Sequence, residues 1–295
     1  MYRFVLLTLI TLGFIGCEKK VKFDLKEASE LLTVDASIET GQDPVVILTK
    51  SLNYFSKITV DVLSQSLIKD AEVYISDGTK THKLKRYDIT LQGNVPFSLY
   101  SSDPADPSTI IKGDFGKSYQ LRIVWKGTEY TSSTTIPLLR KTIDSLWWVK
   151  APNTPDTSKK VVARARVTDP PGFGDYARYF TKVNSESFLP GLNSVFDDQL
   201  VNGSTYTVDV DRGVDRNADL DFEEYGFFHK GDTVTVKFCN INKATFDFWR
   251  TVEYSYSSIG NPFSSPTKII GNISNGALGY FGGYANQFKT IIIPR

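Results

Sequence analysis

The sequence has 295 residues and a nearly even charge balance, with 34 Lys and Arg residues against 33 Asp and Glu residues. This balance excludes the strongly basic composition that is typical of nucleic-acid-binding proteins, and we expect no nucleic-acid partner. Hydrophobic residues make up 41% of the chain, so we expect it to bury a core and to fold.

The first 16 residues have the layout of a secretory signal peptide. Arg3 precedes an apolar run over residues 4–15, and Gly16 stands directly before Cys17. The run is shorter than the about 20 residues that a membrane-spanning helix needs. A cysteine directly after the small residue is typical of a lipoprotein signal, in which the thiol receives a diacylglycerol before cleavage. We therefore predict that Cys17 is lipidated; the alternative is an ordinary signal peptide with a chance cysteine.

The charged, irregular residues 17–30 are predicted to be a lipidated tether, and residues 31–140 an N-terminal β domain. Apolar and polar residues alternate over 32–38 and 119–126, and turn pairs such as Asp77-Gly78 separate the short segments. This spacing predicts antiparallel sheets that pack as a sandwich of the immunoglobulin-like kind.

Pro137 and the Pro-, Thr- and Ser-rich residues 151–158 place a boundary near the middle of the chain. We predict a second β-rich domain over 141–295, because alternation resumes at 161–168 and 205–210. In the same region, apolar residues recur at helical offsets after Asn242, a plausible N-cap. A helix near 243–256 is therefore predicted to pack on the second sandwich. The fold class is mostly β, with two sandwiches.

Two aromatic segments are candidates for a binding surface. One is the Trp pair at 147–148, which either begins a strand or forms a platform for sugar rings. The other is the Gly-rich tail at 261–284, which either packs as core or forms a surface groove, because glycines beside aromatic rings allow close backbone approach. The candidate residues are Trp147, Trp148, Phe263, Tyr280, Phe281 and Tyr284.

An acidic stretch after residue 208 is a weak candidate for calcium, which prefers hard oxygen ligands. Its candidate ligands are Asp211, Asp215, Asn217 and Asp219. The calcium-loop pattern fails where Leu220 replaces glycine and Gly226 replaces the closing glutamate. A solvated acidic loop is the favoured interpretation, and we expect no metal and no cofactor.

Motifs for catalysis are absent from the sequence. It has two histidines, and it contains no nucleophile elbow, phosphate loop, dinucleotide glycine pattern or zinc-ligand spacing. Cys239, in an alternating segment, is interpreted as a strand residue rather than a nucleophile. We predict a protein that is not an enzyme.

Several segments resemble, in the same order, the domain of unknown function 4249 family of Bacteroidota lipoproteins. These are residues 68–78, 116–121, 130–137, 169–172, 197–203, 231–234 and, most specifically, 261–281. The resemblance covers essentially the whole mature chain. It implies an envelope lipoprotein encoded near TonB-dependent receptors, and it brings no known reaction or catalytic residue.

Three functions follow as hypotheses. The first is an outer-membrane lipoprotein, anchored in the bilayer through Cys17, that serves a TonB-dependent transporter as an accessory or ligand-capturing partner. The second is a stand-alone binding module of the cell envelope for a glycan or peptide. The third, least favoured, is a hydrolase with an unrecognised site. Lysines at 19 and 20 leave the surface and periplasmic faces of the membrane both open.

Overall fold

The computed structural model describes residues 30–52, 59–91, 95–155, 157–216, 218–259, 261, 265 and 267–295. The predicted signal peptide, Cys17 and the tether up to residue 29 lie outside the described residues, as do Asn217 and Phe263. The chain is mostly β, as the sequence predicts, and two α-helices accompany the sheets in the described part of the chain.

Most elements in the described part of the chain are strands. They are, in chain order, β1 (Leu32–Glu39), β2 (Val45–Lys50), β3 (Glu72–Ser76), β4 (Thr81–Lys83), β5 (Lys85–Leu91), β6 (Val95–Ser101), β7 (Ser118–Trp125), β8 (Thr128–Thr135), β9 (Thr142–Lys150), β10 (Lys160–Thr168), β11 (Tyr176–Val183), β12 (Leu189–Phe196), β13 (Thr205–Val210), β14 (Phe228–His229), β15 (Thr233–Ile241) and β16 (Leu278–Ile292). The helices are α2 (Val60–Ser66), the 3₁₀ turn η1 (Pro107–Thr109) and α3 (Lys243–Ser257).

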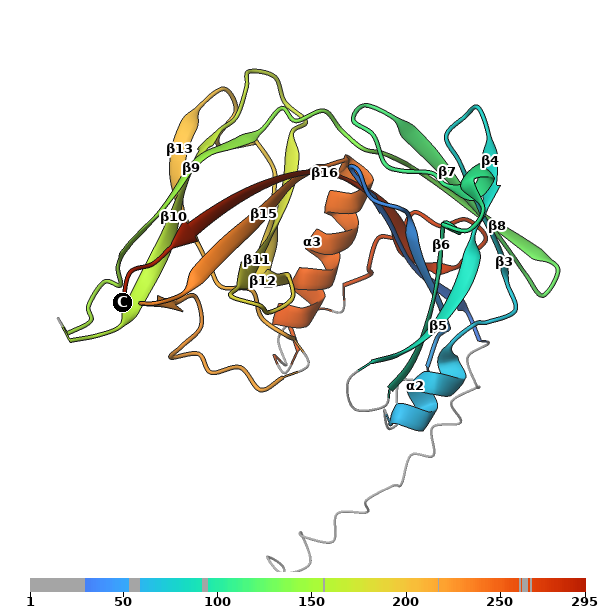
Figure 1. Cartoon of the computed structure of the whole chain (residues 1–295), viewed down its shortest axis with the longest axis horizontal. Coiled ribbons are helices and arrows are strands. Elements are labelled where there is room, and N and C mark those ends of the chain that lie inside the picture. The colour runs from blue at the N-terminus through green and yellow to red at the C-terminus, as the bar shows by residue number, and fades with distance from the viewer. Residues whose placement is uncertain are drawn as a thin grey trace, which may run out of the picture.

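One long sheet organises the molecule. Its eight strands run in the order β12-β11-β15-β16-β1-β2-β6-β5. Two four-stranded sheets accompany it, β4-β3-β7-β8 and a second in which β10 pairs with β9, β13 and β14. Figure 1 shows β9, β10 and β13 at one end of the long sheet and β3, β4, β7 and β8 at the other.

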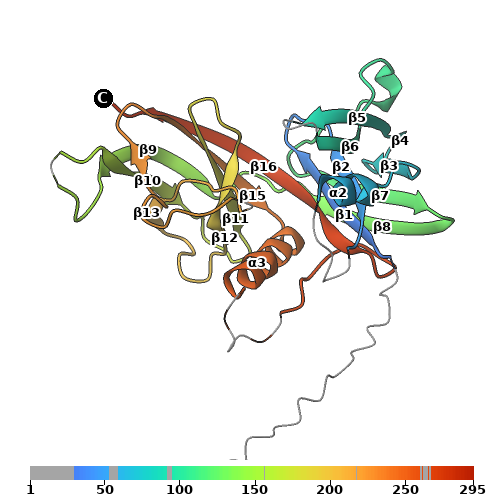
Figure 2. The same ribbon diagram turned by 90° about the horizontal axis from the view of Figure 1, so that it is seen from below.

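The long sheet crosses the predicted domain boundary. β16, from the end of the chain, pairs in parallel with β1, and Gly279 lies opposite Val34. A side chain at Gly279 would overlap the carbonyl oxygen of Val34, so this close pairing requires glycine there. Figure 2 shows β16 running between the two groups of strands. The division at residue 140 stays a prediction, but the two halves of the chain share one sheet.

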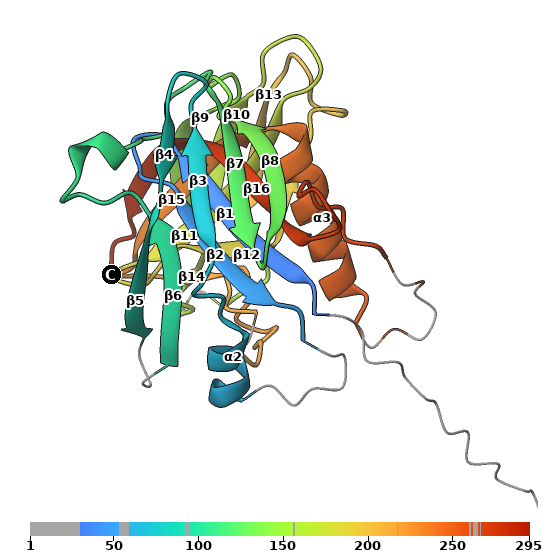
Figure 3. The same ribbon diagram turned by 90° about the vertical axis from the view of Figure 1, so that its right-hand side faces the viewer.

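Alternation along β16 sends its residues to two different layers. Phe281 and Ala285 belong to the core between the long sheet and β3 and β7, where they pack with residues such as Leu32 and Val73. Figure 3 shows β3, β4, β7 and β8 as a layer over β1. Tyr280 and Tyr284 face the opposite side, against α3. A third core lies between β10 and the strands β11 and β15.

The predicted helix is confirmed as α3. Asn242 caps it by accepting a hydrogen bond from the backbone N–H of Thr245 at 2.9 Å. Its aromatic residues pack on β11 and β16. The sequence patterns did not predict α2, in which Thr59 caps a seven-residue helix. A segment that short carries too few apolar repeats to distinguish a helix from a loop.

Candidate functional site

A groove lies on the α3 side of the long sheet, where β1 meets β16; we call it the central groove. Its volume is about 420 Å³. The sheet supplies Asp35, Glu39, Arg178, Phe180, Tyr280 and Tyr284, and Ser37 lies between them. Trp249 of α3, the start of β12 and residues 214–216 form the other walls.

Strand register explains why residues from distant parts of the sequence meet there. Tyr280 lies opposite Asp35, and Tyr284 lies opposite Glu39, in the parallel pair of β1 and β16. Residues directly opposite in a sheet point to the same face, so the two tyrosines and the two carboxylates share one surface. Gly282 between the tyrosines leaves room for α3, because a side chain there would collide with Tyr280.

Arg178 is the most unusual residue of the central groove. Its side chain is buried, with 3% of the residue exposed. Its Nε donates to Ser194 Oγ at 3.1 Å, its Nη1 donates to Tyr284 Oη at 3.3 Å, and its guanidinium lies 3.5 Å from the ring centre of Trp249. Among the described residues it forms no ion pair. A buried charge normally has a counter-charge, because desolvation is costly.

A hydrogen-bonded chain behind Arg178 fixes its position. Ser194 Oγ donates to Glu253 Oε1 at 2.5 Å, and Arg216 Nη2 donates to the same oxygen at 3.0 Å. Glu253 therefore pairs directly with Arg216 and is connected to Arg178 only through Ser194. On the other side, Trp249 Nε1 donates to Tyr284 Oη at 2.9 Å.

Asp35 supplies the opposite charge. Asp35 is exposed to solvent, and it lies in the lining of the groove. Burial raises the pKa of Asp35, while Arg178 and the Tyr280 hydroxyl oppose that rise. Burial also raises the pKa of Tyr280 and of Tyr284, so both phenols stay protonated and can donate hydrogen bonds.

Glu39, at the outer end of the groove, is already paired. Lys237 Nζ lies 2.6 Å from both of its carboxylate oxygens, and Asn286 Nδ2 donates to Oε2 at 2.7 Å. Its charge is therefore balanced within the protein, which leaves Asp35 as the carboxylate of the β1 face without an ion pair among the described residues.

The raised pKa of Asp35 leads to a prediction about stability. The carboxyl binds a proton more readily in the folded chain than in the unfolded chain, where its pKa is the ordinary 3.8. Its ionisation therefore lowers the stability of the fold as the pH rises above 3.8. We expect Asp35→Asn to raise the melting temperature at pH 7, and the gain to shrink as the pH falls towards 3.8. Thermal unfolding at several pH values tests this. Asp209→Asn, which removes a carboxylate that is ion-paired with Arg164, should show no such gain.

The structure separates the candidate aromatic residues. Tyr280 and Tyr284 line the central groove. Phe281 is a correction, because it is fully buried in the core and cannot be part of a binding surface. Trp147 and Trp148 are half-buried on β9, in agreement with the strand interpretation. Neighbours on a strand point to opposite faces, so the pair cannot form one continuous platform.

The acidic stretch does not converge on a metal site among the residues that the structure describes. Asp211 Oδ2 accepts a hydrogen bond from Tyr225 at 3.1 Å, and Asp215 lies at the wall of the central groove. Cys239 is fully buried on β15, and burial raises its pKa to about 12, which makes the thiol a poor nucleophile.

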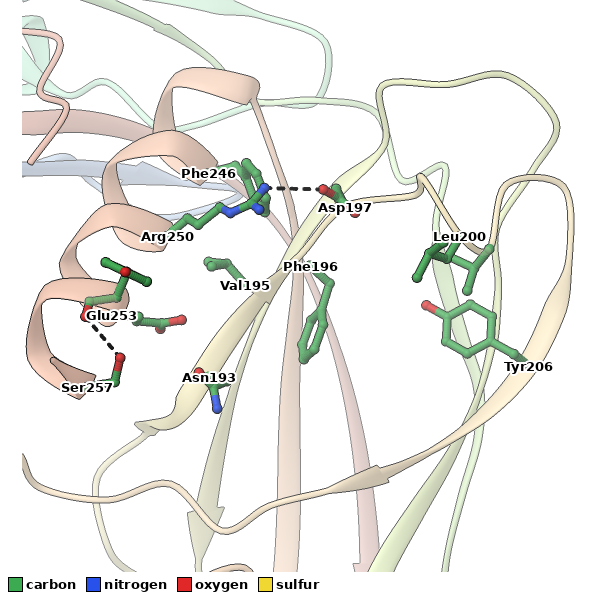
Figure 4. Close-up of a pocket in the computed structure, with 12 residues that line it drawn as sticks. Asn193, Val195, Phe196, Asp197, Leu200, Tyr206, Phe246, Arg250, Glu253 and Ser257 are labelled. Carbon is green, nitrogen blue, oxygen red and sulfur yellow. Dashed lines mark hydrogen bonds and ion pairs between the residues drawn. The ribbon is translucent and has the colours of Figure 1, made fainter. Parts of the chain in front are cut away.

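A second pocket, of about 480 Å³, lies on the other side of α3 (Figure 4). Phe246 and Arg250 project into it from the helix, across from Leu200 and Tyr206. Arg250 lies 3.5 Å from Asp197 at its rim. The pocket holds no buried unpaired charge among the described residues. The central groove is therefore the stronger candidate.

The sequence patterns did not identify Asp35, Arg178 and Trp249 as site residues. Of these residues, Arg178 is the one that the sequence could have indicated as a site residue. It is a charged residue among the aromatic residues of 176–180, on the buried face of a strand. The arrangement can hold a charged ligand in a fixed orientation. Tyr, Arg and carboxylate side chains of the groove form hydrogen bonds and ion pairs within the protein. The described groove residues include no nucleophile with an adjacent base.

No helix within the described residues has the length and apolar character to cross a membrane.

No curated protein matches the chain. A family model described as a domain of unknown function, DUF4249, matches residues 18–290. The match covers nearly all of the sequence, from the tether to the last strand, and the protein therefore belongs to the DUF4249 family.

Proposed function

We propose that the protein is a lipid-anchored, non-enzymatic outer-membrane protein that captures a small ligand for a TonB-dependent transporter. The observation that carries the ligand-capturing role is Arg178, a buried guanidinium that lines the central groove and forms no direct ion pair within the described residues.

The proposed location rests on the sequence. The apolar run before Gly16 and Cys17 is typical of lipoproteins, and acyl chains contribute about 0.8 kcal/mol per buried methylene to membrane binding. An anchored protein is confined near a receptor in the same membrane, which raises its effective concentration there. We further infer that each layered half is an immunoglobulin-like sandwich, which the alternating strands and facing sheets support.

Affinity purification from cross-linked, detergent-solubilised outer membranes tests the transporter partnership. The tagged wild-type protein should recover a TonB-dependent receptor, and the Cys17→Ser variant, which lacks the lipid site, should recover much less. Repeated failure of the wild-type protein to recover any outer-membrane receptor would refute the partnership. If the protein still bound a ligand in that case, it would be a stand-alone binding module of the envelope.

A further inference from the structure

Two opposite charges face the central groove without pairing with each other. Arg178 and Asp35 are close enough for their charges to interact, yet they form no direct ion pair. The tyrosines Tyr280 and Tyr284, whose hydroxyls lie 3.1 Å apart, stand beside them. Tyr280 hydrogen-bonds to Asp35 and Arg178 to Tyr284, so the two hydroxyls connect the charged groups, and a ligand in the groove can reach both charges.

Arg178 lines the central groove and has N–H donors that no described residue accepts. Guanidinium has five N–H donors in one plane. The Trp249 ring covers one face of that plane, and the two hydrogen bonds to Ser194 and Tyr284 use Nε and Nη1. Nη2 has no acceptor among the described residues, yet it is not a fully enclosed atom. Its N–H groups can therefore bind a ligand carboxylate in the groove.

We propose that the central groove binds a free α-amino acid, with its carboxylate on Arg178 and its ammonium on Asp35. This inference rests on the proposed ligand-capturing function and names its ligand class. A simple anion would satisfy Arg178 but would place a like charge beside Asp35. A simple cation would satisfy Asp35 and leave Arg178 unpaired.

The remaining walls favour an amino acid with an apolar or aromatic side chain. Phe180, Leu189, Pro190 and Trp249 line the groove around the two charged groups. The volume of about 420 Å³ lies within the range of about 300–1,000 Å³ that is typical of small-molecule sites. Strands and a helix, rather than loops alone, hold Asp35, Arg178 and Trp249, so the site is preorganised.

Isothermal titration calorimetry of the purified mature chain tests this assignment with matched probes. L-phenylalanine carries both charges, 3-phenylpropionate lacks the ammonium, and 2-phenylethylamine lacks the carboxylate. We expect L-phenylalanine, or L-tryptophan or L-leucine in its place, to bind at least about tenfold more tightly than the corresponding single-charge analogue. Arg178→Gln and Asp35→Asn should each weaken binding of the amino acid by at least about tenfold.

Arg164→Gln is the matched control, because it removes an exposed arginine from β10, outside the groove, and should leave the affinity unchanged. If Arg178→Gln does not fold, the comparison of probes on the wild-type protein and Asp35→Asn still decides the question. Binding of the single-charge analogues as tightly as the amino acid would overturn the proposal, as would absence of binding by all three amino acids. Recovery of a receptor from membranes is independent of either result.

Discussion

Lys141→Met should lower the free energy of unfolding by about 3–5 kcal/mol, because it leaves a buried aspartate without its partner. Lys141 Nζ lies 3.1 Å from Asp169 Oδ1, and both side chains are 0% exposed. Neither carboxylate oxygen of Asp169 has another hydrogen-bond partner among the described residues. Chemical denaturation of the purified variant measures the loss.

The place of this pair in the fold explains its importance. Lys141 precedes β9, and its backbone is held by the long sheet: its N–H donates to Asn240 Oδ1, and its carbonyl accepts from Asn240 and Gln287. The ion pair therefore stabilises the point where β9 and β10 join the long sheet.

Two controls separate the burial of the pair from the loss of charge alone. Arg164→Gln breaks an ion pair whose side chains are 41% and 52% exposed, and it should cost less than about 1 kcal/mol. The double change of Lys141→Met and Asp169→Leu removes both buried charges and should recover much of the stability. A loss below about 1 kcal/mol for Lys141→Met alone would contradict this account.

Phe281→Ala should cost about 3–5 kcal/mol of stability, because it empties a fully buried position in the core beside β1. Phe288→Ala, on the same strand but 53% exposed, should cost far less. Denaturation curves of the two variants compare the positions directly.

Ligand binding adds a second readout for Phe281. Because Phe281 faces away from Tyr280 and the central groove, the folded Phe281→Ala protein should keep the affinity for L-phenylalanine that we propose for the wild type. A small stability cost together with a loss of binding would place Phe281 in a binding surface instead, which is one of the two alternatives that the sequence leaves open.

Local patterns in the sequence were sufficient to predict several of the elements. Alternation predicted β1, β7, β10 and β13, and the helical offsets after Asn242 predicted α3. The glycines of the tail predicted close backbone approach, which Gly279 and Gly283 confirm. These features depend on neighbours within a few residues, so a single segment is enough to predict them.

The central groove could not be predicted in this way. It depends on the parallel pairing of β1 with β16, whose residues lie more than 240 positions apart, as the hydrogen bond from Thr40 to Tyr284 shows. No local pattern shows that Asp35 and Tyr280 are opposite each other or that Arg178 lies near both. The Gly279 and Gly282 positions indicated that something packs closely there, but not which strand.

Complementation tests the central claim most directly, namely that the protein works at the membrane as a ligand-capturing partner. In a host that lacks the gene, the wild-type sequence should restore the growth or uptake that depends on it. The Cys17→Ser variant should yield a folded, unanchored protein that fails to restore it. Full restoration by Cys17→Ser, at an expression level equal to that of the wild type, would contradict the account.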